Sequence, residues 1–406
     1  MSLSLVDKLK NQYAFMDEIA QIYGTNMGTF HPRLLIAICF LLVEQVMHIH
    51  GLIQCWSNPI DVCNGLMIYS IAIQLVVKLA SRLLHNDDKL VSEIQKIINN
   101  FYDREQKIKQ NRKILQKHLN NYECIMKIYS VAFLTLFLIP TITSAILSWY
   151  TGEFILFSPI YLPLTDPTKK FGYFLNFIIM GFESILTCLI FLPADLLYIN
   201  FAYQTVPMSQ IFIKKLKKFG NEIIEIENNK CEENSIKFMS KYSVQKEHEK
   251  QQKLEEENFL KLKELIKEFN EYNNLISLSL KYMSFTSFIA ISTNAIAISM
   301  AIIILFFFSV SIGFAASIIF LIQMLNPCMQ GSLIVHQNTK IFDAIYDFPW
   351  YYLTEEQKKI YLQFIHLSQN AKKLRILILD ELNMELFTKA LNACYTYMMF
   401  IWNIMK

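Results

Sequence analysis

Ionisable side chains interrupt several strongly apolar stretches of this sequence. Glu44, His48 and His50 lie in the first apolar run, and Glu183 and Asp195 lie in a later one. Carboxylates and imidazoles are the groups that proteins use for proton transfer and metal binding. Inside a membrane they are costly unless they face other helices or water. They therefore favour either contacts between helices or the chemistry of a membrane enzyme or proton-coupled transporter.

Motif searches weigh against the enzyme and the transporter. Two histidines at positions i and i+2 lie on different faces of a helix, so His48 and His50 do not predict a metal site. The sequence has no HExxH motif, paired Asp motif, nucleophile elbow or phosphate-binding loop. We see no inverted repeat of the transporter kind. We predict that the chain is not an enzyme and uses no metal or other cofactor.

A second polar pattern lies at the C-terminal end, in residues 382–406. The stretch can cross a bilayer, because a helix that rises about 1.5 Å per residue needs about 20 residues to span about 30 Å of hydrocarbon. One face of this helix is polar, with Asn392, Thr396, Tyr397 and Asn403. These side chains either hydrogen-bond to neighbouring helices or line a hydrated path through the membrane.

The composition indicates an all-α, polytopic membrane protein. Of the 406 residues, 53% are hydrophobic and only 18% are charged, which is far more apolar than a soluble protein of this size. The formal net charge of +3 is too small to suggest a nucleic-acid partner. Cys55 and Cys63 flank one short loop and are either a disulfide pair or two separate thiols.

Apolar runs and the residues that break them predict seven transmembrane helices. The predicted spans are 34–55, 66–84, 125–150, 171–202, two spans within 278–335, and 382–405. A turn near Ser309 to Gly313 is expected to separate the fifth span from the sixth. Helical periodicity in residues 85–122 predicts a pair of helices outside the membrane. Thr354 is expected to cap a helix, and the charged stretch Asn221 to Glu257 is expected to be partly disordered.

The distribution of positive charge predicts the orientation. The segments on one side of the membrane contain 30 Lys and Arg residues and those on the other contain three, while five more, including Lys78, are assigned to span ends. Positively charged loops stay in the cytoplasm. We therefore predict a cytoplasmic N-terminus and an extracellular C-terminus, the reverse of a G-protein-coupled receptor. The predicted regions are a cytoplasmic N-terminal segment (1–33), spans one to six with cytoplasmic helical extensions (34–335), a cytoplasmic anchor region (336–381) and the last span (382–406).

Three short patterns resemble those of the insect odorant receptors, and they are most specific in the last quarter of the chain. A late cytoplasmic pattern of a Gly, an Ala-Ile-Tyr and a Trp is matched by Gly331, Ala344 to Tyr346, and Trp350. A terminal pattern of a Phe and a Tyr-x-Tyr is matched by Phe387, Tyr395 and Tyr397. An acidic position in the fourth helix is matched by Asp195.

The tail also approaches a motif of the wider superfamily, which includes gustatory receptors. That motif is Thr-Tyr, five apolar residues and then Gln-Phe, but here Asn403 and Ile404 stand in place of Gln and Phe. The motif alone does not separate the two branches. A gustatory receptor, which forms a homomeric tastant-gated cation channel, therefore remains the alternative.

The resemblance implies a ligand-tuning subunit of an odorant-gated, nonselective cation channel. Such a subunit assembles with the odorant co-receptor (Orco) into a heterotetramer in the plasma membrane of olfactory sensory neurons. Its last helix lines the central pore, which implies that Phe400, Asn403 and Ile404 form the narrow outer part. The cytoplasmic anchor between subunits would include Ile341 to Gln369. The other implied partners are the lipid bilayer and a small volatile odorant.

The resemblance also places the odorant pocket in the outer half of the bundle, among the second, third, fourth and sixth helices. An apolar cavity suits a volatile molecule, because burial of apolar surface contributes about 25 cal/mol per Å². Tyr69 and Trp149 are the strongest candidates, since large amphipathic rings give both contact area and orientation. Ordinary helix packing is the alternative for each residue. The implied pocket residues are Leu66, Tyr69, Ile73, Ile142, Ala145, Trp149, Phe174, Phe177, Ile178, Gly181, Phe314, Ser317 and Ile318.

Overall fold

The computed structural model describes the chain except for residues 1–3, 23–24, 27–28, 31, 55, 85–86, 155, 157–161, 163–164, 167, 237–243, 309–310, 374, 376–380 and 406. Its regular structure is helical apart from two-residue strands, β1 (Thr25–Asn26) and β2 (Thr29–Phe30), which pair antiparallel. The helices are α1 (Leu5–Ile22), α2 (Pro32–Gln54), α3 (Pro59–Leu84), α4 (Asp87–Glu105), α5 (Lys109–Thr151), α6 (Lys170–Ile236), α7 (Val244–Phe308), α8 (Ser311–Tyr346), the 3-10 turn η1 (Trp350–Tyr352), α9 (Glu355–Gln369) and α10 (Met384–Met405). The prediction of an all-α fold is confirmed.

Seven of these helices cover the seven predicted spans, namely α2, α3, α5, α6, α7, α8 and α10. α7 ends at Phe308 and α8 begins at Ser311, and the turn that the sequence places near Ser309 to Gly313 lies partly outside the described residues. By length and hydropathy, four stretches of the described chain are apolar enough to cross a membrane. They are Asp61–Ala80 in α3, Lys170–Asn229 in α6, Gln252–Leu305 in α7 and Ser317–Tyr346 in α8.

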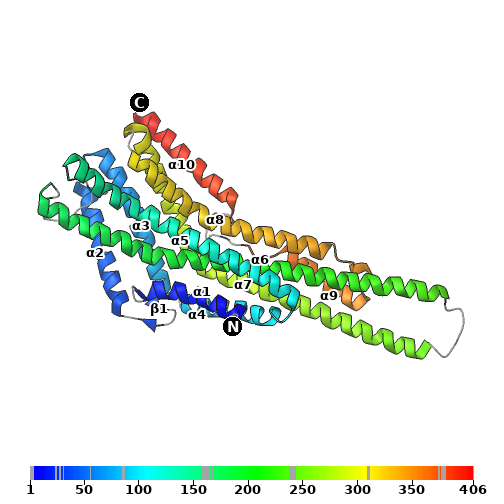
Figure 1. Cartoon of the computed structure of the whole chain (residues 1–406). Helices are drawn as coiled ribbons and strands as arrows, with labels where there is room; N and C mark the ends of the chain where they lie inside the picture. The colour runs from blue at the N-terminus through cyan, green and yellow to red at the C-terminus, as the bar shows by residue number, and fades with distance from the viewer. Residues whose placement is uncertain are drawn as a thin grey trace.

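The two longest helices, α6 and α7, pack against each other and extend together beyond the rest of the molecule (Figure 1). Much of the stretch Asn221 to Glu257, which was expected to be partly disordered, is helical: α6 continues to Ile236 and α7 begins at Val244, while residues 237–243 lie outside the described part. Ion pairs between the two helices give a physical reason. Lys261 Nζ of α7 lies 3.2 Å from Glu222 Oε2 of α6. Within each helix, the pairs Lys218–Glu222 and Lys261–Glu257, four residues apart, add support to the exposed helices.

The hydrophobic core of the bundle continues into the end of the molecule with the most polar sequence. We call this end the polar extension and define it as residues 87–122, 203–236, 252–277 and 336–369. Aromatic rings dominate its core: Phe269 and Phe364 meet edge to face with ring centroids 5.2 Å apart, and Phe348 stacks on Tyr361 at 4.9 Å. These buried rings hold α9 against α7 and α8. The extension is therefore a packed helical unit and not a set of loose loops.

The start of α9 confirms a local prediction from the sequence. Thr354 has extended backbone angles and its hydroxyl accepts a hydrogen bond from the Gln357 backbone N–H at 3.4 Å. The Gln357 side chain in return accepts from the Thr354 backbone N–H at 3.2 Å. This reciprocal arrangement is a capping box, which satisfies two backbone donors that a helix start leaves without partners.

A buried ion-pair network joins α4, α6 and α7 in the polar extension. Lys215 Nζ donates to Glu105 Oε1 at 2.7 Å and to Glu268 Oε1 at 2.6 Å, and Asn111 Nδ2 donates to Glu105 Oε2 at 2.8 Å. Burial would raise the pKa of the Glu105 carboxyl, but the Lys215 ammonium and the other donors hold that pKa below its usual value. For Glu268, burial outweighs the same ammonium and raises the pKa. Glu105 is thus the carboxylate that the network stabilises as an anion.

Candidate functional site

A buried ion pair joins α3 to α6 in the apolar part of the bundle. Lys78 Nζ donates to Asp195 Oδ1 at 2.6 Å, and both side chains are buried. The Tyr129 hydroxyl of α5 donates to Asp195 Oδ2 at 3.0 Å, and Asn326 Nδ2 of α8 donates to the Tyr129 hydroxyl at 3.5 Å. Side chains from α3 and α5 therefore donate to the Asp195 carboxylate of α6, and Asn326 of α8 is linked to it through Tyr129.

The sequence analysis missed the role of Lys78. It assigned Lys78 to the end of a span, whereas the structure places this residue inside α3 and next to the ring of Phe191, with Nζ 3.9 Å from the ring centroid. The sequence does contain an indication of this pair, because a Lys lies in one predicted span and an Asp lies in another. A charge within a membrane span needs a partner of opposite sign.

A small cavity of about 20 Å³ adjoins this ion pair. Its lining includes Gln74, Ser287 and Gln323 from three different helices. In the described part of the chain, both polar atoms of the Gln323 side chain and the Ser287 hydroxyl are buried without a hydrogen-bond partner. A polar space of this size fits a single water molecule and is too small for an odorant.

A second buried cluster joins α2 to α6. Glu44 and His48 lie four residues apart on one face of α2, and Glu183 projects toward them from α6. His48 Nε2 lies 3.3 Å from Glu44 Oε1 and 3.4 Å from Glu183 Oε1. His50 is not among the grouped residues, in agreement with its different helical face. The cluster borders a cavity of about 30 Å³.

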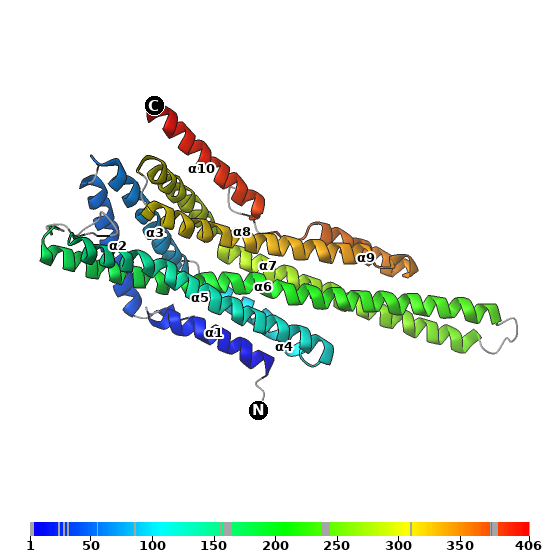
Figure 2. The same cartoon turned by 45° about the horizontal axis from the view of Figure 1, so that its top comes forward.

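The last helix, α10, contacts the bundle along one side. Leu386, Cys394 and Met398 are buried there against α7 and α8, and Cys394 Sγ donates to the Ala295 carbonyl of α7 at 3.3 Å. In Figures 1 and 2 α10 lies at the edge of the bundle beside α8, with the C-terminus at its far end. One buried stripe thus fixes the rotation of α10 about its axis.

The polar face of α10 lies on the opposite side from this stripe. Asn392, Thr396, Tyr397 and Asn403 are all exposed in the single chain. The Thr396 hydroxyl donates to the Asn392 carbonyl of its own helix at 2.8 Å. Among the predicted pore residues, Phe400 is exposed on this outward side and the side chain of Ile404 lies outside the described part. The described polar residues therefore face away from the helices of their own bundle.

A glycine allows the start of α10 to approach α8 closely. A Cβ at Gly331 would lie 1.8 Å from the carbonyl oxygen of Leu382, two residues before α10 begins. Next to this contact, the Met384 backbone N–H donates to the Ser332 hydroxyl at 2.9 Å. Because only a residue without Cβ fits there, Gly331 sets the point from which α10 leaves the bundle.

The predicted pocket residues lie on α3, α5, α6 and α8, and their side chains differ in exposure. Those that are half-buried are Leu66, Tyr69, Ile73, Ala145, Phe177, Gly181 and Ser317. Those that are exposed in the single chain are Ile142, Trp149, Phe174, Ile178 and Ile318. The side chain of Phe314 lies outside the described part, as does Cys55 of the possible disulfide.

The two strongest pocket candidates have different environments. Tyr69 faces the interior, and its ring centroid lies 6.3 Å from that of His48. Trp149 is 86% exposed at the end of α5. The sequence analysis missed Tyr173, whose hydroxyl donates to Ser148 Oγ at 3.0 Å and whose ring stacks on Phe177 at 5.9 Å. Near the end of α5, Tyr173 of α6 therefore contacts α5 through Ser148, whereas the Trp149 ring is exposed.

Comparison with known proteins decides the family. A sequence model described as a seven-transmembrane odorant receptor matches residues 58–395, which is most of the chain. The chain belongs to the odorant receptor family. Its fold is similar to that of the insect olfactory receptor OR5 from Machilis hrabei in complex with eugenol, with a TM-score of 0.70 and 12% identity over 98% of this chain and 99% of that chain. A second structure of the same receptor gives a TM-score of 0.69 with the same identity and coverage. Comparison with curated protein sequences gives no match.

The family assignment confirms several predictions about the receptor. The resemblance carried by Gly331 to Trp350 and by the terminal Tyr residues is correct, and the protein is a multi-pass, all-α membrane protein. The match is to the odorant branch and not to the gustatory alternative. The relatives are receptors and not enzymes. The orientation, the region boundaries and the pocket and pore residues stay predictions.

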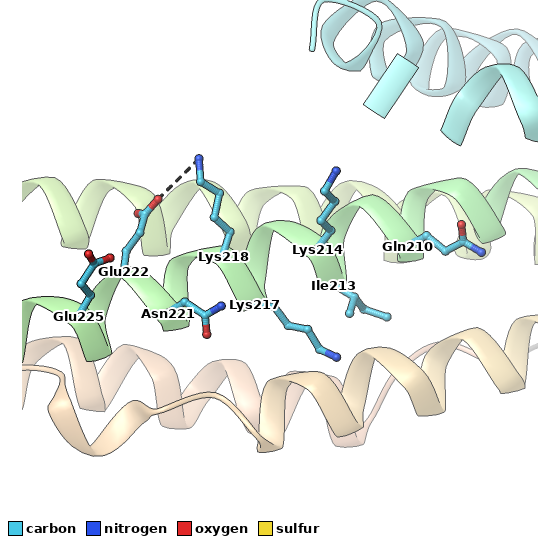
Figure 3. A pocket seen from close by; sticks show the side chains of 8 residues that line it. All are labelled: Gln210, Ile213, Lys214, Lys217, Lys218, Asn221, Glu222 and Glu225. Atoms are coloured by element: carbon cyan, nitrogen blue, oxygen red, sulfur yellow. Dashed lines mark ion pairs between the residues drawn. The ribbon is translucent and has the colours of Figure 1, made fainter. Parts of the chain in front are cut away.

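An open groove of about 700 Å³ runs along α6 in the polar extension of the receptor (Figure 3). Its lining residues are Gln210, Ile213, Lys214, Lys217, Lys218, Asn221, Glu222 and Glu225. Lys218 Nζ lies 3.6 Å from Glu222 Oε1, and Figure 3 shows Lys217 on another side of the helix from Lys218. An open, charged groove does not suit an apolar volatile molecule, which is best held by an enclosed apolar cavity.

Proposed function

We propose that this odorant receptor is the ligand-tuning subunit of an odorant-gated, nonselective cation channel whose pore is lined by α10. The observation that carries the proposal is the outward polar face of α10. Within a bilayer, polar side chains are stable only against protein or water, so this face needs partner subunits or a hydrated path. Several such helices around one axis satisfy both needs, because their polar faces then line a pore.

The partner in this proposal is the odorant co-receptor, in a heterotetramer in the plasma membrane of olfactory sensory neurons. The anchor region, Ile341 to Gln369, would make contacts between the subunits on the cytoplasmic side. Exposed apolar and aromatic side chains support this role, because such residues are enriched at interfaces. In the single chain they are Tyr346, Trp350, Tyr351 and Leu362. The proposed orientation keeps the N-terminus in the cytoplasm and the C-terminus outside.

The proposed ligand is a small volatile molecule, held among α3, α5, α6 and α8. Tyr69 and Phe177 provide half-buried aromatic surface. Next to them, a Cβ at Gly181 would meet no heavy atom within 4 Å, so this part of α6 borders open space. An apolar ligand placed there would bury its surface against these rings.

Recording from cells that express the receptor with the odorant co-receptor tests the proposal. We expect an inward cation current that depends on both subunits and on a subset of a broad odour panel. Currents from the receptor alone would instead support a homomeric channel. Surface-expressed receptor that gives no odour-evoked current across the panel would contradict the proposed function. Epitope tags read from each side of the membrane test the orientation.

Replacing Ile404 by Ser should raise the resting current several-fold or change ion selectivity. Phe400 and Ile404 lie one helical turn apart, and apolar side chains at a narrow point close a pore by excluding water. The measurement is the resting current and the reversal potential in cells that also express the co-receptor. Met384→Ser, at the opposite end of α10, is the matched control. Unchanged resting current and selectivity in Ile404→Ser would contradict the gate assignment.

A further inference from the structure

The Glu44, His48 and Glu183 cluster brings two carboxylates to one nitrogen of a buried imidazole. Both carboxylate oxygens approach the same imidazole atom, Nε2, at 3.3 and 3.4 Å. That nitrogen carries at most one proton, so it donates to only one of the two carboxylates at a time. The second oxygen Oε2 of Glu44 is buried and has no hydrogen-bond partner in the described part of the chain. The Glu44 side chain is only 6% exposed.

The spacing matches that of ligands around one metal ion. A Zn²⁺ ion binds imidazole nitrogen and carboxylate oxygen at about 2.0 to 2.2 Å in tetrahedral geometry, which separates neighbouring ligand atoms by about 3.4 Å. The separations from Nε2 agree with this value, and the three ligand atoms all lie within 4.8 Å of one another. One imidazole and two carboxylates are a donor set that suits a first-row divalent cation.

Charge and size favour a metal ion over an organic cation. When both carboxylates are ionised they carry two negative charges inside an apolar bundle, and one divalent cation between them brings the formal charge to zero, which lowers the cost of burial. A protonated amine odorant would supply a single positive charge. The adjoining cavity of about 30 Å³ has room for an ion and one water molecule but not for an organic amine.

We propose that Glu44, His48 and Glu183 form a Zn²⁺-binding site that links α2 to α6. Glu44 and His48 provide two ligands from one helical face and Glu183 provides the third from α6. The second oxygen of Glu44 or a water molecule completes the coordination. The site borders Tyr69, so an ion there would hold α2 against α6 next to one wall of the proposed odorant pocket. The proposal is independent of the channel function.

Metal binding by the purified full-length receptor tests the site. The protein is stripped with a chelator, equilibrated with Zn²⁺, and its metal content is measured by mass spectrometry. We expect about one Zn²⁺ per chain. Co²⁺ in place of Zn²⁺ should give the visible absorption of a tetrahedral site with nitrogen and oxygen ligands. Removal of one ligand side chain should lower the Zn²⁺ affinity by more than the roughly 10- to 100-fold that is typical for a change in a residue that only supports a ligand.

Three variants locate the ion. His48→Gln and Glu183→Gln should each lose the bound Zn²⁺ and the Co²⁺ absorption, whereas His50→Gln, on another face of the same helix, should keep both. Equal metal content in wild type, His48→Gln and His50→Gln would overturn the proposal. If a ligand variant does not fold, the wild-type protein still decides: no tetrahedral Co²⁺ spectrum overturns the site. Neither readout uses an odour response, so the result is separate from the test of the channel.

Discussion

Asp195→Asn is expected to destabilise the receptor by about 3–5 kcal/mol, the usual cost of removing one partner of a buried ion pair. The substitution leaves the Lys78 ammonium, which now lies 2.6 Å from the Asp195 carboxylate, without its counter-charge inside the bundle. It also weakens the acceptor of the Tyr129 hydroxyl at 3.0 Å. The contact of Lys78 with the Phe191 ring offsets only a small part of this loss. Thermal unfolding of the purified receptor and its level at the cell surface measure the effect.

Double substitution separates charge from packing. Lys78→Met combined with Asp195→Asn removes both charges, and replacement of a buried ion pair by uncharged side chains is often close to neutral. The double variant should therefore recover most of the stability that Asp195→Asn loses. Asp166→Asn, at an exposed carboxylate, is the matched control and should change stability little. Equal stability of Asp195→Asn and wild type would show that the charge of Asp195 does not hold α3 against α6.

The helices of this receptor could be predicted from local sequence, because local rules decide them. A run of about 20 apolar residues must be a helix in a bilayer, since its backbone groups have no other partner there. The capping box at Thr354 uses two residues three positions apart, so it too is visible in the sequence. The extent of α6 and α7 was underestimated. Their charged ends are stabilised by pairs such as Lys261 with Glu222, which lie on different helices.

The partners of buried ionisable groups could not be predicted, because they are set by packing between distant segments. Glu44 and His48 are four residues apart, so their shared face was visible, but Glu183 joins them only when α6 packs against α2. Lys78 and Asp195 are 117 residues apart. A single sequence contains no information on which of several buried acids faces which base.

The position of Trp149 relative to the proposed pocket could not be predicted from the sequence either. An amphipathic ring at the end of a span can bind a ligand or lie at the membrane surface, and both functions require the same residue type. Its 86% exposure in the single chain favours the surface position. Tyr69, inside α3, faces inward toward His48. The rotation of a helix about its axis, which the sequence does not specify, separates the two cases.

For α10 that rotation is fixed by a few contacts, so a change at its base should have a large effect on gating. In Gly331→Ala the new Cβ would lie 1.8 Å from the Leu382 carbonyl oxygen, so the start of α10 must move. Overpacking of this kind costs about 1–3 kcal/mol, which exceeds the gain of up to about 1 kcal/mol from replacing Gly by Ala in a helix. We expect lower thermal stability and a strong reduction of odour-evoked current with the co-receptor present.

Gly181→Ala provides the matched control for stability, because it makes the same exchange where a Cβ meets no heavy atom within 4 Å. It should keep or slightly raise the unfolding temperature, since only the gain in helix propensity remains. A lower stability of both variants would show that the loss comes from replacing a helical Gly by Ala and not from the contact with Leu382. A loss confined to Gly331→Ala, with normal surface levels and altered current, would show that the contact between Gly331 and Leu382 sets the position of the polar face of α10. Normal current and stability in Gly331→Ala would mean that α8 and α10 adjust without moving that face. The contact between Gly331 and Leu382 would then not be what positions the proposed pore lining.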